Sequence, residues 1–441
     1  MRTAFFLSCL ALLAPVLSHA QSVPTLEVAT DREYYHPSSK VYIEAHVGAT
    51  PTEHARPEAQ RNIAFVLDRS GSMAGTPIQS LRRALSTTLS SLSNQDFVSI
   101  VLFGSEVETL QEAQPRARIA DVDSLLAKIE PAGGASLYDA LNQGAAQIRR
   151  QASPATVNHL ILVSGGHPTK GPRELVDFSK LAEVFKKEGI TLSTIGVGQD
   201  FDEDLLAALA RAGNGTFRFA AQPEKLPEVL QAEIAPSRTL VARDAVLTVE
   251  YGFDCREVTS YGWKQPLIED KKITYRLPYL FAGEDLRLLT SAMVSGHGYS
   301  YTPAVVRLKW NDLTTGAPTE IKKSVHMEFE SDDIAVRKSA NPAMVRTSAI
   351  TLISEGMQRA IEQIDKGNFR RAMKELRNAR DDAESMNEDV DDPLVKAKIK
   401  LLETYVAEVK ARGMNQLDRK ILRSGLYNQF ETPTAEEQKD K

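Results

Sequence analysis

The sequence predicts a doubly wound α/β domain that is inserted into an antiparallel β-sandwich and followed by a helical segment. Three observations support this fold class. Unbroken apolar runs alternate with amphipathic stretches between residues 62 and 236, runs of alternating polar and apolar residues flank this region, and helical spacing dominates after residue 341. Strands that are apolar on both faces are typical of a parallel sheet covered by helices, whereas alternating strands belong to half-buried antiparallel sheets.

The first twenty residues have the pattern of a secretory signal peptide. Arg2 provides a positive end, an apolar run extends from Ala4 to Leu17, and Ser18-His19-Ala20 places small residues where a signal peptidase cleaves. We therefore expect export to the periplasm, the cell surface or the medium. The alternative is an uncleaved anchor, but the apolar run is shorter than the roughly 20 residues that a membrane-spanning helix needs. No later run approaches that length, so we expect no membrane span.

Half-buried strands are expected on both sides of the α/β region, within residues 21–50 and within residues 239–333. The first pair surrounds the turn-forming sequence His36-Pro-Ser-Ser, and later runs such as Ala245–Tyr251 also have a period of two. Because two strands do not form a stable sheet alone, we expect the first pair to complete the later group, so that the α/β domain is an insertion. The alternative, an independent N-terminal hairpin, leaves apolar faces uncovered.

Residues 62–236 show the expected alternation of strands and helices. The parallel strands are expected to contain the apolar runs Ile63–Leu67, Phe97–Phe103, Leu160–Val163 and Ile190–Val197. Apolar residues three or four positions apart mark the intervening helices, and the first such face contains Ile78, Leu81, Leu85, Leu89 and Leu92.

Residues 341–430 are expected to be helical, because three apolar faces with helical spacing follow one another. The third face contains Leu394, Leu401 and Tyr405. The first two resemble one tetratricopeptide-like helix pair, but a repeat array needs about three or more units, so we expect a helical appendage. Residues 431–441 are charged and expected to form a flexible tail.

The composition is that of a folded protein, and it excludes several functional classes. The net charge of -5 and the sequence pI near 6.0 provide no positive field for DNA or RNA, so we expect no nucleic-acid partner. The two cysteines, Cys9 and Cys255, exclude a disulfide framework and a cysteine-cluster zinc site. The sequence has no His-Glu-x-x-His pair and no Gly-x-Ser-x-Gly elbow, so we do not expect an enzyme.

The motif with binding chemistry is Asp68-Arg-Ser-Gly-Ser-Met73, at the carboxyl end of the first expected parallel strand. Ligands of open α/β sheets bind at the carboxyl ends of strands, near the point where the strand order reverses. A carboxylate and two hydroxyls are hard oxygen ligands, which suit Mg²⁺, Mn²⁺ or Ca²⁺ better than zinc. By itself this spacing is better explained by a turn that caps a helix.

Seven stretches of the sequence, in order, resemble a von Willebrand factor A (VWA) domain. They are Ile63–Met73, Gly75–Ile78, Asp96–Phe103, Gly133–Leu141, Leu160–Gly166, Ile195–Gly198 and Asp202–Leu206. This resemblance favours a ligand site at the motif over a simple turn. The resemblance implies a six-stranded Rossmann-like sheet with a metal-ion-dependent adhesion site on its top face, where an acidic group of the bound partner completes the metal shell. The flanking strands and helices are similar, less specifically, to bacterial exported proteins that carry this domain.

The ligand set implied by the resemblance is incomplete in this sequence. Where the family has Thr in its second loop, this chain has Ala135, with Ser136 beside it, and where the family has a second Asp, this chain has Gly165. The candidate metal ligands are therefore Asp68, Ser70, Ser72 and Ser136. With one carboxylate instead of two, we expect weak binding of Mg²⁺ or Mn²⁺, because hard-cation affinity depends on ligand charge.

Three side chains are candidates to complete the shell: Ser136 if its loop shifts, Asp139, and His167. Whether the site binds metal stays open on the sequence. The resemblance implies an exported, non-enzymatic, adhesion-like module that binds a protein partner at the top face, with the partner offering an acidic residue. The alternative is a metal-independent structural scaffold of an envelope assembly, and the dependence of partner binding on divalent ions separates the two.

Overall fold

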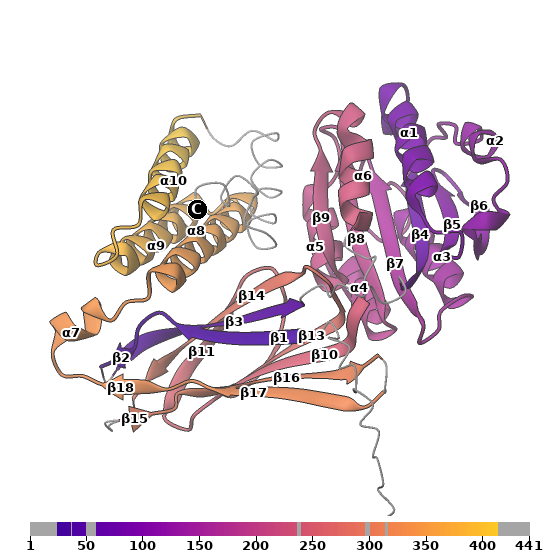
Figure 1. Ribbon diagram of the computed structural model, residues 1–441. Helices are drawn as coiled ribbons and strands as arrows, with labels where there is room; N and C mark the ends of the chain where they lie inside the picture. Colours follow the sequence, from indigo (N-terminus) through magenta and orange to yellow (C-terminus); the bar gives the residue numbers. More distant parts are fainter. Residues whose placement is uncertain are drawn as a thin grey trace, which may run out of the picture.

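Three parts of the chain are seen in the computed structural model: an α/β domain, a sandwich and a group of helices (Figure 1). The structure describes residues 24–36, 38–49, 59–235, 240–295, 300–313 and 316–412. The expected signal peptide, the end of the expected helical region and the expected tail lie outside the described residues.

The α/β domain contains a six-stranded sheet with the order β6-β5-β4-β7-β8-β9, in which β6 is antiparallel and the other strands are parallel. The strands are β4 (Gln60–Asp68), β5 (Phe97–Phe103), β6 (Val107–Pro115), β7 (Thr156–Ser164), β8 (Ile190–Val197) and β9 (Asn214–Ala220). The helices are α1 (Thr76–Ser91), α2 (Val122–Ala127), α3 (Leu137–Arg149), α4 (Leu175–Lys187), α5 (Glu203–Ala212) and α6 (Leu226–Ile234). This confirms the predicted doubly wound fold.

Both faces of this sheet are buried, as its unbroken apolar runs predict. Along β4, Ala64 and Val66 belong to the core under α3, α4 and α5, whereas Ile63, Phe65 and Leu67 belong to the core under α1 and α6. The strand order reverses at β4, which has β5 on one side and β7 on the other. The carboxyl ends of β4 and β7 therefore form the switch point at which open α/β sheets bind ligands.

The sandwich has a four-stranded sheet, β1-β3-β14-β11, and a five-stranded sheet, β12-β13-β10-β16-β17. Their strands are β1 (Pro24–Thr30), β3 (Ser39–Ala49), β10 (Leu240–Tyr251), β11 (Cys255–Tyr261), β12 (Leu267–Glu269), β13 (Lys272–Phe281), β14 (Asp285–Val294), β16 (Ala304–Asp312) and β17 (Pro318–Ser324). A small third sheet contains β2 (Tyr34–Tyr35), β15 (Ser300–Tyr301) and β18 (Met327–Phe329). The antiparallel pairing of β3 with β14 joins the segment before the α/β domain to the segment after it, which confirms the predicted insertion.

Trp263, in the connection between β11 and β12, packs into the hydrophobic core of the α/β domain. Its indole Nε1 donates a hydrogen bond to the carbonyl of Gly215, at the start of β9 (3.3 Å). Arg211 at the end of α5 lies over the indole ring and donates to the Trp263 carbonyl (3.1 Å). An aromatic side chain from the sandwich thus packs against the α/β domain at the amino end of β9.

Tyr279 and Arg243 of the sandwich extend this contact to the starts of the neighbouring strands. The Tyr279 hydroxyl donates to the carbonyl of Gly189 (2.9 Å) and accepts from the backbone N–H of Asn158 (3.1 Å), while Arg243 donates to the carbonyl of Thr156 (2.9 Å). These backbone groups lie at or just before the amino ends of β7 and β8. The sandwich therefore holds the amino ends of the parallel strands, and the carboxyl ends lie at the opposite end of the domain.

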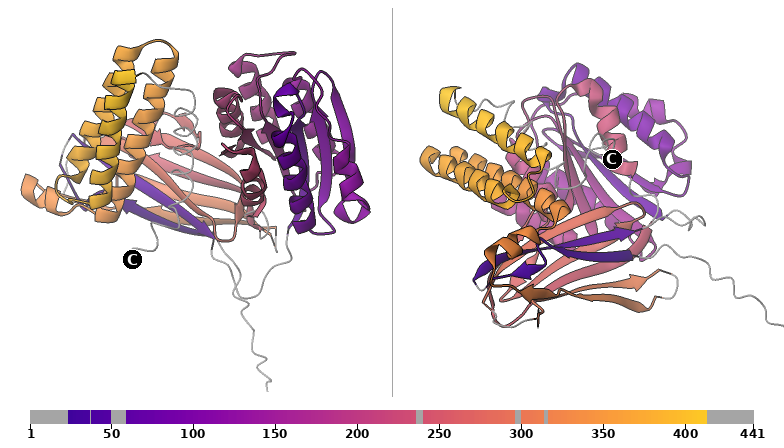
Figure 2. Two further views of the ribbon diagram at one scale, coloured as in Figure 1. Left: turned by 90° about the horizontal axis from the view of Figure 1, so that it is seen from above. Right: turned by 60° about the vertical axis from the view of Figure 1, so that its left-hand side comes forward.

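The helices after the sandwich are α7 (Asp333–Lys338), α8 (Pro342–Asp365), α9 (Phe369–Asn387) and α10 (Pro393–Arg412). Met344 and Leu352 of α8 pack on Tyr42, Tyr261 and Leu289 of the four-stranded sheet. Figure 2 shows the helices over one end of this sheet and the α/β domain beyond its other end. None of the helices in the described ranges is long and apolar enough to span a membrane.

The packed face of α10 differs from the predicted one. The sequence predicts a face with Leu394, Leu401 and Tyr405, but α10 packs on α8 and α9 through Val395, Ile399 and Leu402. Leu401 is 59% exposed, and the side chain of Tyr405 lies outside the described residues. The period was correct but the face was wrong, because two apolar rows share this helix and only the packing of its neighbours selects one.

Candidate functional site

Asp68 is the last residue of β4 and lies fully buried at the switch point. Its Oδ1 accepts a hydrogen bond from the backbone N–H of Ser70 (2.7 Å). Its Oδ2 accepts from the Ser164 hydroxyl and from the backbone N–H of Gly165 (both 3.0 Å), at the carboxyl end of β7. One carboxylate therefore ties the ends of the two central strands together.

Ser70 and Ser72 stand beside Asp68, as the spacing of the motif predicts. Their hydroxyl oxygens lie 3.0 Å apart. The residues Gly71–Met73 form a short 3₁₀ turn that begins after Ser70, and the Ser70 side chain makes no capping hydrogen bond in it. Ser70 is buried and Ser72 is exposed, so the pair leads from the buried carboxylate to the surface. We call the end of the domain that carries these residues the top face.

No hydrogen bond of the described residues joins Ser136, in the second loop, to Asp68, Ser70 or Ser72. The Ser136 hydroxyl is directed to the carbonyl of Ser105, at a long distance of 3.5 Å. Beside it, the backbone N–H of Ala135 donates to the Thr169 hydroxyl (2.7 Å). Thr169 lies in the loop after β7 and was missed by the sequence motifs, because a hydroxyl that binds backbone has no spacing rule of its own.

The glycines after β7 differ in the direction that a side chain would take. A Cβ atom at Gly165 would lie 2.5 Å from the sulfur of Met73, whereas a Cβ at Gly166 would lie 2.8 Å from the Ser72 hydroxyl oxygen and 3.8 Å from that of Ser70. An aspartate at Gly165 must therefore displace the end of the flexible Met73 side chain. Gly166 is the glycine that faces the two hydroxyls directly.

Neither of the two other candidate ligands contacts the first loop. The Nδ1 atom of His167 lies 3.2 Å from a carboxylate oxygen of Asp202, which caps the start of α5. Asp139 is exposed in the first turn of α3, where a negative charge favours the positive end of the helix.

Two cationic side chains border the site. Lys170 donates from Nζ to the carbonyl of Ser105 (2.6 Å), the same carbonyl that the Ser136 hydroxyl approaches. Arg69, within the first loop, pairs with Glu108 on β6 (2.9 Å). Both were outside the predicted ligand set. Lys170 adds positive charge near a group that has one carboxylate, whereas Glu108 offsets the charge of Arg69.

The donor set fits one side of the shell of a hard cation. Asp68, Ser70 and Ser72 supply adjacent oxygens, but three of the roughly four acceptor positions of the carboxylate are already used by the chain. Ala135 and Gly165 contribute no ligand from the other loops. Within the described ranges no three His, Cys, Asp or Glu residues group as a metal site. The residues therefore fit a weakly held ion rather than a tight one.

The family comparison now decides the identity of this domain. The model of the von Willebrand factor type A domain matches residues 62–232. Residues 62–232 are a VWA domain. A sequence relative, the inter-alpha-trypsin inhibitor heavy chain H2 of Mus musculus, is 34% identical over 164 residues. That match covers 35% of this chain and 17% of the relative, so the chain spans only a small part of the relative's length.

Two solved structures share the fold of nearly the whole chain, including the parts that flank the VWA domain. A von Willebrand factor type A protein from Catenulispora acidiphila has a TM-score of 0.70 at 17% identity and covers 94% of this chain and 99% of its own. The ArnB paralog VWA2 from Sulfolobus acidocaldarius has a TM-score of 0.62 at 17% identity and covers 93% and 100%. The combination of VWA domain, sandwich and helices therefore recurs as one fold.

The VWA domain contains one serine–histidine pair, but its geometry is not that of a catalytic relay. The Ser193 hydroxyl lies 2.9 Å from Nε2 of His159, and Glu233 lies 3.5 Å from the same ring nitrogen. A relay uses both nitrogens of the ring, one for the nucleophile and one for the carboxylate. All three residues are buried, so the group is a structural network between β7, β8 and α6.

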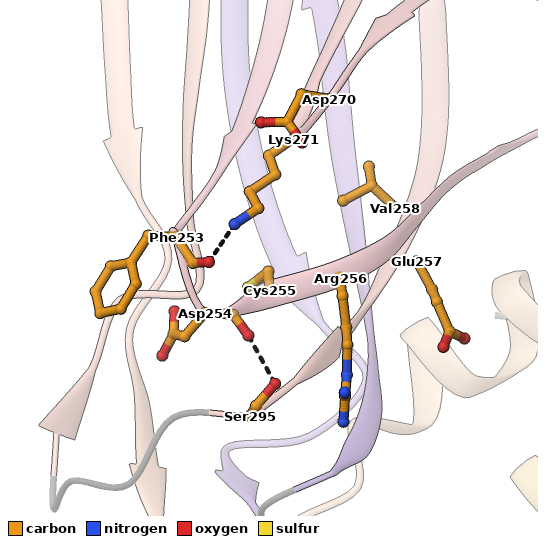
Figure 3. A pocket seen from close by; sticks show the side chains of 9 residues that line it. All are labelled: Phe253, Asp254, Cys255, Arg256, Glu257, Val258, Asp270, Lys271 and Ser295. Carbon is orange, nitrogen blue, oxygen red and sulfur yellow. Dashed lines mark hydrogen bonds between the residues drawn. The ribbon is translucent and has the colours of Figure 1, made fainter.

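A cavity of about 420 Å³ lies in the sandwich, at the end of β10 remote from the VWA domain (Figure 3). Phe253, which is 91% exposed, stands at its edge, and Lys271 donates to the Phe253 carbonyl. Burial raises the pKa of the Cys255 thiol, which disfavours a reactive thiolate. The residues that line this cavity all belong to the sandwich and not to the top face.

Proposed function

We propose that this protein is an exported, non-enzymatic module that binds a protein partner at the top face of its VWA domain. The observation that best supports this proposal is the first loop. There, Asp68, Ser70 and Ser72 place side-chain oxygens next to one another at the switch point, and Ser72 is exposed. Binding residues concentrate on loops that a rigid sheet positions. VWA domains are generally interaction modules, which supports this role.

The position of the sandwich supports the choice of the top face. The sandwich contacts the amino ends of the parallel strands through Trp263 and Tyr279, so these contacts of the described residues lie at the end of the domain opposite the first loop. A partner of protein size can therefore approach the first loop without displacing the sandwich.

In the first version of the proposal, a weakly held Mg²⁺ or Mn²⁺ takes part in the contact. Asp68, Ser70 and Ser72 would hold the ion, and Ser136 would join them if its loop shifts. An acidic residue of the partner would supply the negative charge that Gly165 does not. The ion would provide a positive centre for that carboxylate, so binding of ion and partner should strengthen each other.

In the second version, the domain is a metal-independent scaffold of an envelope assembly. Asp68 favours this version, because its three hydrogen bonds already satisfy the buried carboxylate within the chain. The cation Lys170 favours it as well, because it adds positive charge near the site.

Partner capture from an envelope extract tests the proposal. The full chain should retain a partner, and Ser72→Arg should abolish retention because a large cation fills the exposed end of the first loop. Ser90→Arg is the matched control, since Ser90 is also exposed but lies at the opposite end of α1. Loss of retention with a chelator supports the first version, and retention with a chelator supports the second. Equal retention by Ser72→Arg and the parent contradicts a top-face contact.

Export is tested separately by mass spectrometry of the secreted or periplasmic protein. Cleavage after Ala20 should give a chain that starts at Gln21. An intact leader, or lipid on Cys9, contradicts this part of the proposal.

A further inference from the structure

β12 is an edge strand of the five-stranded sheet, and its pairing partner in the described part of the chain is β13 alone. All of its residues are exposed, with Leu267 at 54% and Ile268 at 45%. A sheet edge with exposed apolar side chains pairs readily with another chain, so folded proteins usually protect their edges, most often with lysine. β12 contains no lysine.

The opposite edge of the same sheet has this protection. β17 is mostly exposed and carries Glu320, Lys322 and Lys323. The one charged residue of β12 is Glu269, which lies opposite Lys272 of β13 in the strand register, so these two charges offset each other. The two edges of one sheet therefore differ in kind, and β12 is the edge suited to pairing.

The strand register assigns the two apolar side chains of β12 to different faces of the sheet. Ile268 lies opposite Ile273, whose side chain is fully buried in the sandwich core, so Ile268 lies on the core face. Leu267 lies opposite Thr274 on the outer face, and the alternation along β13 places Arg276 on that face as well. A strand added beside β12 would therefore bring one row of side chains next to Ile268 and the other row onto the face that carries Arg276.

Positive charges gather near this edge. α4 ends beside β13, because the Tyr279 hydroxyl donates to a backbone carbonyl just after that helix (2.9 Å). Burial lowers the pKa of Lys186 in α4. The nearby positive charges of Lys264 and Arg276 lower it further, while Glu183 opposes them. We call Lys186, Lys264 and Arg276 the cation group, and no ion pair of the described residues includes any of the three.

We propose that the edge of β12 binds an extended, acidic segment of a partner protein, which pairs with it as an added strand. In this mode of binding, main-chain hydrogen bonds provide affinity and alternate side chains provide specificity. Apolar residues at every second position of the segment would cover Ile268. Acidic residues at the other positions would offset the cation group, whose charge together with Glu183 is +3 − 1 = +2. A second copy of β12 offers only Glu269 and complements this charge poorly.

Fluorescence anisotropy with the full chain tests this proposal. The probe is a labelled peptide of Val-Glu repeats, which should bind, and the control peptide of Val-Lys repeats has the opposite charge and should not. Lys264→Glu with Arg276→Glu should weaken binding roughly tenfold or more, because two exposed charge pairs with the peptide are lost. Arg276→Glu alone serves if the double variant folds poorly. Lys322→Glu with Lys323→Glu makes the same charge change at the opposite edge of the sheet and should leave the affinity unchanged.

Strand pairing and its location have readouts of their own. Methylation of the backbone nitrogens of the Val-Glu peptide removes its main-chain donors without changing its charge, and it should abolish binding. A photoreactive residue in the unmethylated peptide should cross-link to residues 264–274, as identified by mass spectrometry. Absence of binding, equal binding of the Val-Glu and Val-Lys peptides, or a cross-link to the top face would overturn the proposal. Dimerisation of the free chain that Ile268→Lys abolishes would show that a second copy occupies the edge, which also contradicts it.

Discussion

At the scale of single residues, Asp68 is both a candidate ligand and a structural contact. The same carboxylate that begins the candidate site also fastens β4 to β7. A substitution there removes a buried acceptor from three donors, so loss of binding by Asp68 variants must be separated from loss of stability. The neighbouring glycines provide a cleaner test, because they add a ligand instead of removing one.

Gly165→Asp should raise the affinity for Mn²⁺ by roughly tenfold or more, because hard-cation affinity rises with ligand charge. The variant should also unfold more easily, since its Cβ must displace the sulfur of Met73. Addition of Ala135→Thr should raise the affinity further, and Asp68→Ala should abolish it. Calorimetric titration with Mn²⁺ measures all three.

Gly166→Asp is the matched control for this titration, because its Cβ faces the Ser70 and Ser72 hydroxyls. If Gly166→Asp raises the affinity while a folded Gly165→Asp does not, then Gly166, and not Gly165, occupies the position of the family's second aspartate.

His159 should make stability depend on pH. Burial lowers its pKa, and nearby Arg218 lowers it further, although Glu233 opposes both. Unfolded chains bind a proton at His159 below the ordinary pKa near 6.5, whereas the folded protein keeps the ring neutral, so stability is lost as the pH falls below 6.5. The loss should approach about 1.4 kcal/mol per pH unit for one proton.

Urea unfolding at pH 7.5 and 5.5 measures this effect in the parent and in His159→Gln. Burial alone would raise the pKa of Glu233, but Arg218 and His159 hold it below its ordinary value, so its own contribution is lost only below about pH 4.5. The interval above pH 5 therefore separates the contribution of His159 from that of Glu233, and the comparison with His159→Gln removes the contributions that the other titrating groups make to both proteins. An equal pH dependence in the parent and the variant would assign the effect to other groups.

A residue of the site could be predicted from the sequence where its contacts are to residues nearby in the sequence. Asp68, Ser70 and Ser72 are adjacent in sequence and share one loop, so their spacing was enough to bring them together. Ser164, the last residue of β7, and Thr169, in the loop that follows, contact the site through single hydroxyls from a distant part of the sequence. Such contacts depend on the path of that loop, which no local pattern specifies.

At the scale of elements, the sequence predicts the buried face of a helix best where only one face of that helix is apolar. The first helix buries Ile78, Leu81, Leu85 and Leu89, as its period predicts. Strand β6 has no apolar run because it lies at the sheet edge with mostly half-buried residues, and the sequence analysis did not propose it. In α10, two apolar rows left the choice to tertiary packing.

The connection between β11 and β12 is the element that fixes the VWA domain on the sandwich. Trp263→Ala should cost about 3–5 kcal/mol, because it removes a buried aromatic side chain and its contacts. We expect the VWA domain and the sandwich of the variant to melt in two separate transitions, whereas the parent melts in one. Differential scanning calorimetry measures the change.

Trp310→Ala is the control, since Trp310 is the other tryptophan of the chain and belongs to the sandwich core. It should lower the stability without separating the two transitions. Two transitions already present in the parent would show that Trp263 does not couple the domains.

At the scale of the whole molecule, the fold class was predictable because texture changes twice along the chain, from alternating to unbroken apolar runs and back. The pairing of β3 with β14 joins residues more than two hundred positions apart in sequence. It was nevertheless predictable, because two strands alone do not form a stable sheet and must pair with further strands. The contact between the domains was not predictable, because Trp263 and Tyr279 occur in runs that also fit an ordinary sandwich.

The insertion makes a strong prediction about fragments. The chain leaves the sandwich at Ala49, whose carbonyl accepts from the N–H of Gly283 (2.7 Å), and re-enters at Leu240, which pairs with Phe281. Both ends of the insertion therefore lie beside the same turn, and a linker of roughly ten residues can replace residues 50–236. The shortened chain should melt cooperatively, because β1 and β3 still complete the core with Leu26, Ile43 and Val47.

The complementary fragments complete this test. Residues 60–235 should fold alone, because an inserted domain closes its own two cores. Residues 240–333 should not melt cooperatively without residues 24–49, because β14 then exposes an edge and the apolar face beneath β1 and β3. Circular dichroism during heating distinguishes the fragments. A cooperative melt of residues 240–333 alone would mean that the strands before the VWA domain only cover a sandwich that is already complete, and that the VWA domain is joined to its end rather than inserted within it.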